Sequence, residues 1–155
     1  MKFIIHGGTL SRSLNSIIGL VSANSTIPIV ENFLFELKDK TLNITTTDLE
    51  TAANLNIELQ DAEDIGINKV CVPAKMFVDI VSKLSNFPLT IFVNEDYSID
   101  ISTDAGKYSL VGVNPDDYPK MPEIEEPNSV TIKSSTLVDS ISKTIFATSN
   151  DEFRP

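Results

Sequence analysis

Four basic side chains lie in segments whose apolar residues recur at helical spacing, where they could contact phosphate groups. The segments are residues 9–21, 73–85 and 136–148, and the basic residues are Arg12, Lys75, Lys83 and Lys143. Together the segments hold four basic and two acidic side chains, a net charge of +2. The rest of the chain holds eight basic and twenty acidic side chains, a net of −12, and the whole chain carries −10. The overall charge alone would argue against nucleic acid, whereas the placement of the charges does not.

A helix that packs an apolar stripe on a sheet must turn its other face elsewhere. If three similar helices face the same way, they form a weakly positive surface on an otherwise acidic protein. Six charges are a small sample, so a chance shortage of acids in the helices is the alternative.

Other residues that could carry chemistry have simpler roles. Asp48 and Glu50 are two apart, which places both carboxylates on one face of a strand, but the nearby sequence supplies no further ligand; we predict that Asp48 stabilises a turn. The single histidine, His6, lies in a strand and is predicted to be structural or surface-exposed, and Cys71 to be a small core residue. The sequence has no glycine-rich phosphate loop, CxxC pair or nucleophile elbow, so we predict no catalytic residue, metal or cofactor.

The chain repeats itself, and repeats indicate a fold assembled from similar units. A shift of 127 positions aligns Thr9 with Thr136 and Leu10 with Leu137, and carries Pro28 onto Pro155. A weaker copy begins near residue 69, at a shift of 66. The third unit has a strand and a helix but no further strands, so the chain is expected to be incomplete.

Hydrophobic periodicity predicts the elements of these units. Strands are expected at residues 2–6, 32–37, 41–47, 51–59, 69–72, 89–93, 97–102, 107–113 and 130–133. Helices are expected at residues 9–21, 73–85 and 136–148, with Thr9 as N-cap of the first and Pro73 at the first position of the second. The result is an α+β fold with two β-α-β-β-β units. Residues 60–68 form an acidic connection, and residues 114–128, rich in proline and acids, are predicted to leave the domain as a linker.

Length and composition fit one soluble domain. A chain of 155 residues with 41% hydrophobic residues can bury one core. No apolar run is long enough to span a bilayer, and a single cysteine suits a reducing cytosol, so a cytoplasmic location without a membrane partner is expected.

Several motifs resemble the bacterial sliding clamp, the beta subunit of DNA polymerase III. They include Thr26-Ile27-Pro28-Ile29, Thr47-Asp48-Leu49-Glu50, Val72-Pro73-Ala74-Lys75, Tyr108-Ser109-Leu110 and Asp117-Tyr118-Pro119. The resemblance covers the whole chain with nearly colinear spacing. It implies a clamp fold in which helices lie on one side of antiparallel sheets. It also implies a domain at residues 1–122, a linker at 123–128, and the opening strand and helix of a second domain at 129–155.

The resemblance implies a non-catalytic processivity factor. Two subunits form a homodimeric ring around double-stranded DNA, with helices lining the hole, and the ring tethers the replicative polymerase without reading sequence. The polymerase and the clamp loader bind mainly to parts of the family protein that this chain lacks. The alternative is a protein-interaction scaffold of the same fold without a DNA role.

Carried onto this sequence, the family's DNA contacts fall on the basic residues named above and on Asn24. Asn24 stands where the family often has arginine, and Asp151 and Pro155 also depart from the pattern near family contacts. The subunit interface is implied for Tyr108 and Leu110 on the last strand of the first domain. Because alternate strand residues share a face, both could instead face the core.

Overall fold

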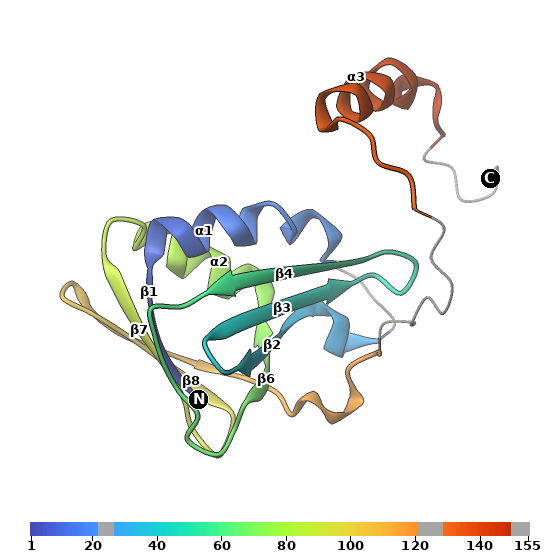
Figure 1. Cartoon of the computed structure of the whole chain (residues 1–155). Helices are drawn as coiled ribbons and strands as arrows, with labels where there is room; N and C mark the ends of the chain where they lie inside the picture. Colours follow the sequence, from blue (N-terminus) through green and yellow to red (C-terminus); the bar gives the residue numbers. More distant parts are fainter. Residues whose placement is uncertain (22–26, 121–128, 150–155) are drawn as a thin grey trace. The chain divides into compact units, whose positions relative to one another are not determined.

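The computed structural model describes residues 1–21, 27–120 and 129–149. It divides the chain into two compact units, residues 1–121 and 122–155. The first unit contains all the described strands and the first two helices (Figure 1). None of the helices in the described ranges has the length and hydrophobicity to cross a lipid bilayer.

The first β-α-β-β-β unit forms close to the predicted positions. Its elements are β1 (Lys2–His6), α1 (Gly7–Asn15), β2 (Asn32–Lys38), β3 (Thr41–Thr47) and β4 (Ala52–Glu58), with short 3-10 turns η1 (Ile18–Leu20) and η2 (Pro28–Glu31) after α1. The prediction that Thr9 caps the helix is wrong. The Gly8 N–H donates instead to His6 Nδ1 at 3.2 Å, so the helix begins two residues earlier, at Gly7.

The second β-α-β-β-β unit repeats this order of elements. It comprises β6 (Lys69–Pro73), α2 (Ala74–Lys83), β7 (Pro88–Val93), β8 (Ser98–Thr103) and β9 (Gly106–Val111). Pro73 ends β6 and precedes the helix rather than occupying its first turn. A short strand, β5 (Asp61–Glu63), lies in the acidic connection, where none was predicted; it forms because it pairs with residues 2–4 of β1.

The two units exchange their first strands. One antiparallel sheet has the order β5-β1-β7-β8-β9, so the first strand of the first unit lies among the strands of the second. The other sheet has the order β4-β3-β2-β6, with the reverse exchange. The two repeats are therefore interlocked and fold as one body.

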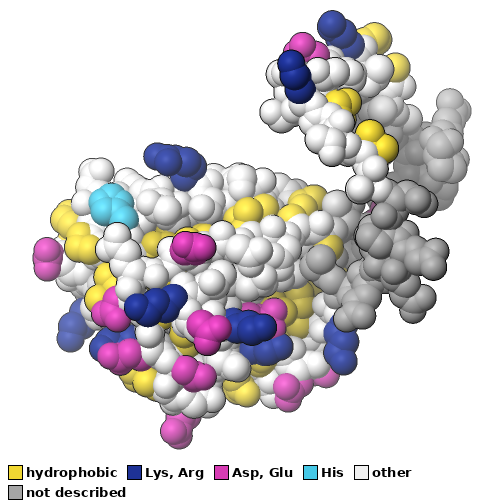
Figure 2. All heavy atoms as spheres, in the orientation of Figure 1, with side chains coloured by type: hydrophobic (Ala, Val, Ile, Leu, Met, Phe, Trp, Pro, Cys, Tyr) yellow, Lys and Arg dark blue, Asp and Glu magenta, His cyan; other side chains and the backbone are white. Residues whose placement is uncertain are grey.

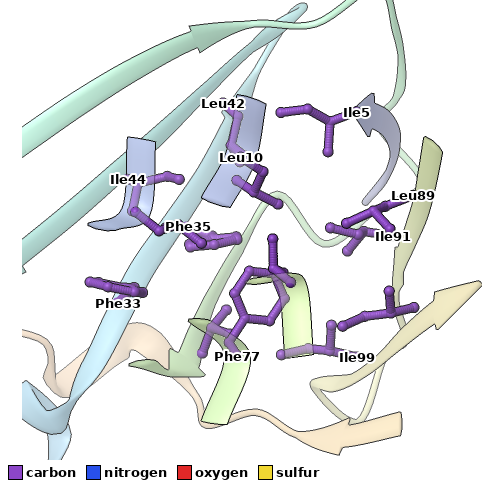
Figure 3. Packing of buried hydrophobic residues seen from close by; sticks show 14 of the residues in the cluster. Ile5, Leu10, Phe33, Phe35, Leu42, Ile44, Phe77, Leu89, Ile91 and Ile99 are labelled. Atoms are coloured by element: carbon purple, nitrogen blue, oxygen red, sulfur yellow. The ribbon is translucent and has the colours of Figure 1, made fainter. Parts of the chain in front are cut away.

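Both helices lie side by side on one side of the sheets (Figure 1), as the predicted fold class requires. Their apolar faces enter one core shared by the two sheets: Leu10 of α1 and Phe77 of α2 are fully buried. Figure 3 shows Phe77 among side chains of both sheets, and its ring meets that of Phe35 edge-on at 5.3 Å. The core therefore holds the helices at a fixed place on the sheets.

The segment after β9 differs from the predicted linker. A 3-10 turn, η3 (Pro115–Asp117), is followed by Tyr118, which is buried against the four-stranded sheet. The Tyr118 hydroxyl donates to the backbone oxygens of Asn32 and Thr45, both at 3.3 Å. Residues 114–118 thus belong to the first compact unit.

The second of the two compact units contains α3 (Ser134–Thr144) and a 3-10 turn, η4 (Ile145–Ala147). The strand predicted at residues 130–133 is not formed. A strand needs a neighbour for its backbone hydrogen bonds, and the described residues of this unit supply none.

Candidate nucleic-acid interface

Helices α1 and α2, both in the first compact unit, form an antiparallel pair. Gly7, which begins α1, donates its N–H to the Phe87 oxygen just beyond α2 at 2.9 Å. Ser11 and Ser82 join the two helices through their hydroxyl groups at 3.1 Å. At the other end, Val21 and Lys75 line the same hollow, so the chain after α1 lies beside the start of α2.

The outward face of this pair is polar and slightly basic. Its exposed side chains include Thr9, Arg12, Asn15, Lys75, Asp79, Ser82 and Lys83. Three cations against one anion give this face a net charge of +2. In Figure 2, acidic side chains lie mainly over the strands and turns, with basic ones among them, and few lie over the helices. The partition of charge predicted from the sequence is thus present within the first compact unit, residues 1–121.

Lys75 is the best placed of the basic residues. It lies in the first turn of α2, where Pro73 offers no side-chain cap to the free amides. A hollow of about 230 Å³ opens beside it, with Glu31 as its acidic member. The start of a helix carries a partial positive charge and free N–H donors, both of which favour a phosphate. Lys75 adds a full positive charge at the same place.

Arg12 and Lys83 lie near the C-terminal ends of their helices, whereas Lys75 lies near the N-terminal end of α2. Each is in the last turn of its helix, α1 and α2 respectively, and each is exposed. The ion pairs among the described residues are Lys2 with Glu63 and Lys69 with Glu36, so none of the three helix cations is held by a carboxylate. They are available to an external anion.

The other two predicted contacts, Asn24 and Lys143, stay predictions. Asn24 lies outside the described residues. Lys143 is exposed on α3 and belongs to the second unit.

Strand β9 has one open edge, because it pairs only with β8 within the described sheet. Leu110 is buried, 6% exposed, whereas Tyr108 on the same face is 39% exposed. Val111, which the sequence analysis did not single out, is 80% exposed on the opposite face. An open edge that shows apolar side chains favours pairing with another chain.

Two of the remaining sheet edges are less open. Strand β5 has three residues, two of them acidic, and β6 is joined to Val113 by paired backbone hydrogen bonds at Cys71. Strand β4 is an edge strand like β9, and side chains of Asn54 and Asn56 on it bond Asn43 of β3 at 2.8–2.9 Å across the sheet face. Short, charged or covered edges resist pairing, so β9 and β4 are the available edges among the described strands.

Asp48 and Cys71 have the structural roles predicted for them. The Asp48 carboxylate accepts from the backbone N–H groups of Glu50 at 3.0 Å and Thr51 at 2.6 Å, which stabilises the turn between β3 and β4. Cys71 is buried, and burial raises the pKa of its thiol to about 12. Within the described ranges, no three His, Cys, Asp or Glu side chains gather closely enough to hold a metal ion.

Two interlocked β-α-β-β-β units, with paired helices on one side of antiparallel sheets, define a clamp-type fold. The family model of the DNA polymerase III beta subunit, N-terminal domain, matches residues 1–122. The chain belongs to this family.

Individual relatives agree. The chain is 29% identical to the beta sliding clamp of Staphylococcus epidermidis and 28% identical to that of Staphylococcus aureus, in each case over 100% of this chain and 42% of the relative. The crystal structure of the DNA polymerase sliding clamp from Bacillus subtilis matches with a TM-score of 0.88 at 29% identity, covering 100% of this chain and 42% of that one. The DNA polymerase III subunit beta from Pseudomonas aeruginosa matches with a TM-score of 0.89 at 27% identity, covering 99% and 41%. This chain therefore spans less than half the length of these relatives.

Proposed function

We propose that this chain is part of a sliding clamp, a processivity factor that encircles duplex DNA and tethers the replicative polymerase. The carrying observation is the cationic face of the α1/α2 pair in a member of the DNA polymerase III beta family. The chain itself is proposed to catalyse nothing, since its role is to hold a polymerase near its template.

The proposed DNA contacts are Arg12, Lys75 and Lys83 on this face, with Asn24 and Lys143 as further contacts. Contacts of this kind fall on phosphates and carry no sequence information. A net charge of only +2 supports loose contact, which a protein that must slide needs. Binding should weaken as salt rises, because each neutralised phosphate releases counterions.

The proposed ring closes through the open edge of β9, with Tyr108 and Leu110 at the subunit interface. Tyr108 offers exposed apolar surface, while buried Leu110 shapes the edge from within. We propose a homodimeric ring with a polymerase and a clamp loader as partners, in the cytoplasm of a bacterium. Residues 1–122 would form one clamp domain, 123–128 a linker, and 129–155 the start of a second domain.

A charge reversal tests this function. Lys75→Glu should keep its fold, because an acid in the first turn of a helix is favourable. In the full-length protein, the Lys75→Glu variant should shorten residence on nicked circular DNA severalfold. It should also reduce the magnitude of the slope of log K for DNA binding against log salt concentration by about 1. Lys40→Glu, a matched change in the exposed turn between β2 and β3, should leave both unchanged. Equal residence for wild type and Lys75→Glu would contradict the DNA role and favour a scaffold without DNA.

A further inference from the structure

A second hollow lies where the chain passes from one sheet to the other, at the start of α1. It has a volume of about 550 Å³, within the range of roughly 300–1,000 Å³ typical of ligand sites. The end of β4, the strands β5 and β1, and the first turn of α1 surround it. It is thus at the opposite end of α1 from the Lys75 hollow.

The hollow has an apolar floor and wall. Ile57 and Leu59 are 8% and 6% exposed and form the buried part, while Ile4 presents 38% of its surface and Pro88 is also exposed. Ile4 lies on β1 opposite Asp61 of β5. In Figure 2 the cyan histidine lies beside yellow hydrophobic side chains. An apolar side chain of a partner would therefore find both a floor and a wall.

The polar members of the hollow give it a negative charge. Glu58 and Asp61 are exposed at its rim, and no Lys or Arg is among its lining residues. Neither carboxylate forms an ion pair with a described residue. The hollow also has three uncharged polar lining residues, His6, Thr9 and Gln60. The Nδ1 atom of His6 accepts from the Gly8 N–H, so only its Nε2 is left for a ligand.

We propose that this hollow is a docking site for a linear peptide that inserts an aliphatic or aromatic side chain next to a Lys or Arg. The apolar floor selects the inserted side chain, and the two unpaired carboxylates select the basic neighbour. The same charges exclude DNA and acidic peptides. The proposal does not depend on the DNA-binding role, because it uses neither α2 nor the basic residues.

The test uses the 155-residue chain, labelled with nitrogen-15, and the peptide acetyl-Lys-Leu-Phe-Lys-amide. Amide shifts should change at Ile4, His6 and Ile57 in a saturable way. The peptides acetyl-Glu-Leu-Phe-Glu-amide and acetyl-Lys-Ser-Gly-Lys-amide should each bind at least about tenfold more weakly. The first lacks the charge match and the second lacks the apolar side chain.

Substitutions distinguish specific binding at this hollow from nonspecific peptide binding. Glu58→Gln with Asp61→Asn should weaken binding about five- to tenfold, as expected for two exposed ion pairs. Glu95→Gln with Asp104→Asn removes the same charge in distant turns and should leave binding unchanged. Equal binding of the acidic and basic peptides, or shifts that map elsewhere, would overturn the proposal. Concentration-dependent shifts at these amides without peptide would also overturn it, because they would assign the hollow to a second copy of the chain.

Discussion

The contact between the start of α1 and the end of α2 sets the geometry of the helix pair, and it requires glycine at position 7. A Cβ added to Gly7 would lie 2.3 Å from the backbone oxygen of Leu84 and 3.2 Å from that of Phe87. Because the nearest obstacle is backbone, no side-chain rotation relieves it. The Gly7→Ala variant must move α1 away from α2, which strains the hydrogen bond from Gly7 to Phe87.

The cost of Gly7→Ala follows from three terms. Overpacking in a well-packed region costs about 1–3 kcal/mol. A weakened hydrogen bond costs about 1 kcal/mol more. Replacing glycine by alanine in a helix returns up to about 1 kcal/mol. The expected loss in the free energy of unfolding is therefore about 1–4 kcal/mol, with about 2.5 kcal/mol at the middle of these ranges.

Urea denaturation followed by circular dichroism measures this loss. With a slope of about 2 kcal/mol/M, a loss of about 2.5 kcal/mol lowers the midpoint by about 1.2 M at unchanged slope. Gly19→Ala is the matched control, because its added Cβ would meet no described atom within 4 Å beyond the adjacent backbone, and it should change stability by less than about 0.5 kcal/mol. A Gly7→Ala variant as stable as wild type would refute the close approach of the two helices.

Three further substitutions test local details, each by the free energy of unfolding. Thr46 is fully buried and its hydroxyl forms no hydrogen bond of good geometry with a described residue, although it lies close enough to the Tyr118 hydroxyl to lower the pKa of that phenol against the larger, opposite effect of burial. Thr46→Val should therefore change the free energy of unfolding by less than about 1 kcal/mol, and a larger loss would show that Thr46 and Tyr118 share a full hydrogen bond. Leu49 has a φ of 82°, so Leu49→Gly should stabilise the turn by about 0.5–1 kcal/mol, and a loss would argue against the left-handed backbone. Burial raises the pKa of Tyr118 to about 12, above its ordinary 10, so its contribution is complete below pH 10 and is lost as pH rises through 12. Tyr118→Phe should cost about 1 kcal/mol at pH 7 and make the alkaline fall shallower; an unchanged fall would contradict this.

The sequence predicted the elements whose pattern is local. Strands such as Pro88–Val93 alternate buried residues with exposed or half-buried ones, and the helices show a clear apolar stripe. It did not predict the start of α1, because His6 caps the helix instead of Thr9, and the Gly7 N–H is bound by the distant Phe87 oxygen. It also missed β5, whose residues Asp61–Glu63 have little strand preference and form a strand only by pairing with β1.

The candidate site was partly predictable for the same reason. Arg12, Lys75 and Lys83 could be assigned to helices from periodicity alone. That Lys75 lies beside the chain following α1, while Lys83 lies near the start of α1, follows from the antiparallel pairing, which no local pattern encodes. The exposure of Val111 was hidden likewise, because it depends on which sheet edge stays open.

The central claim is that the protein holds DNA by encircling it. The most direct measurement compares retention of the natural gene product on nicked circular DNA before and after the circle is cut once. Retention should be stable on the circle and rapidly lost on the linear form, because a loosely bound ring slides off a free end. Equal retention on both forms would contradict it, since that result would mean that the protein binds DNA without surrounding it.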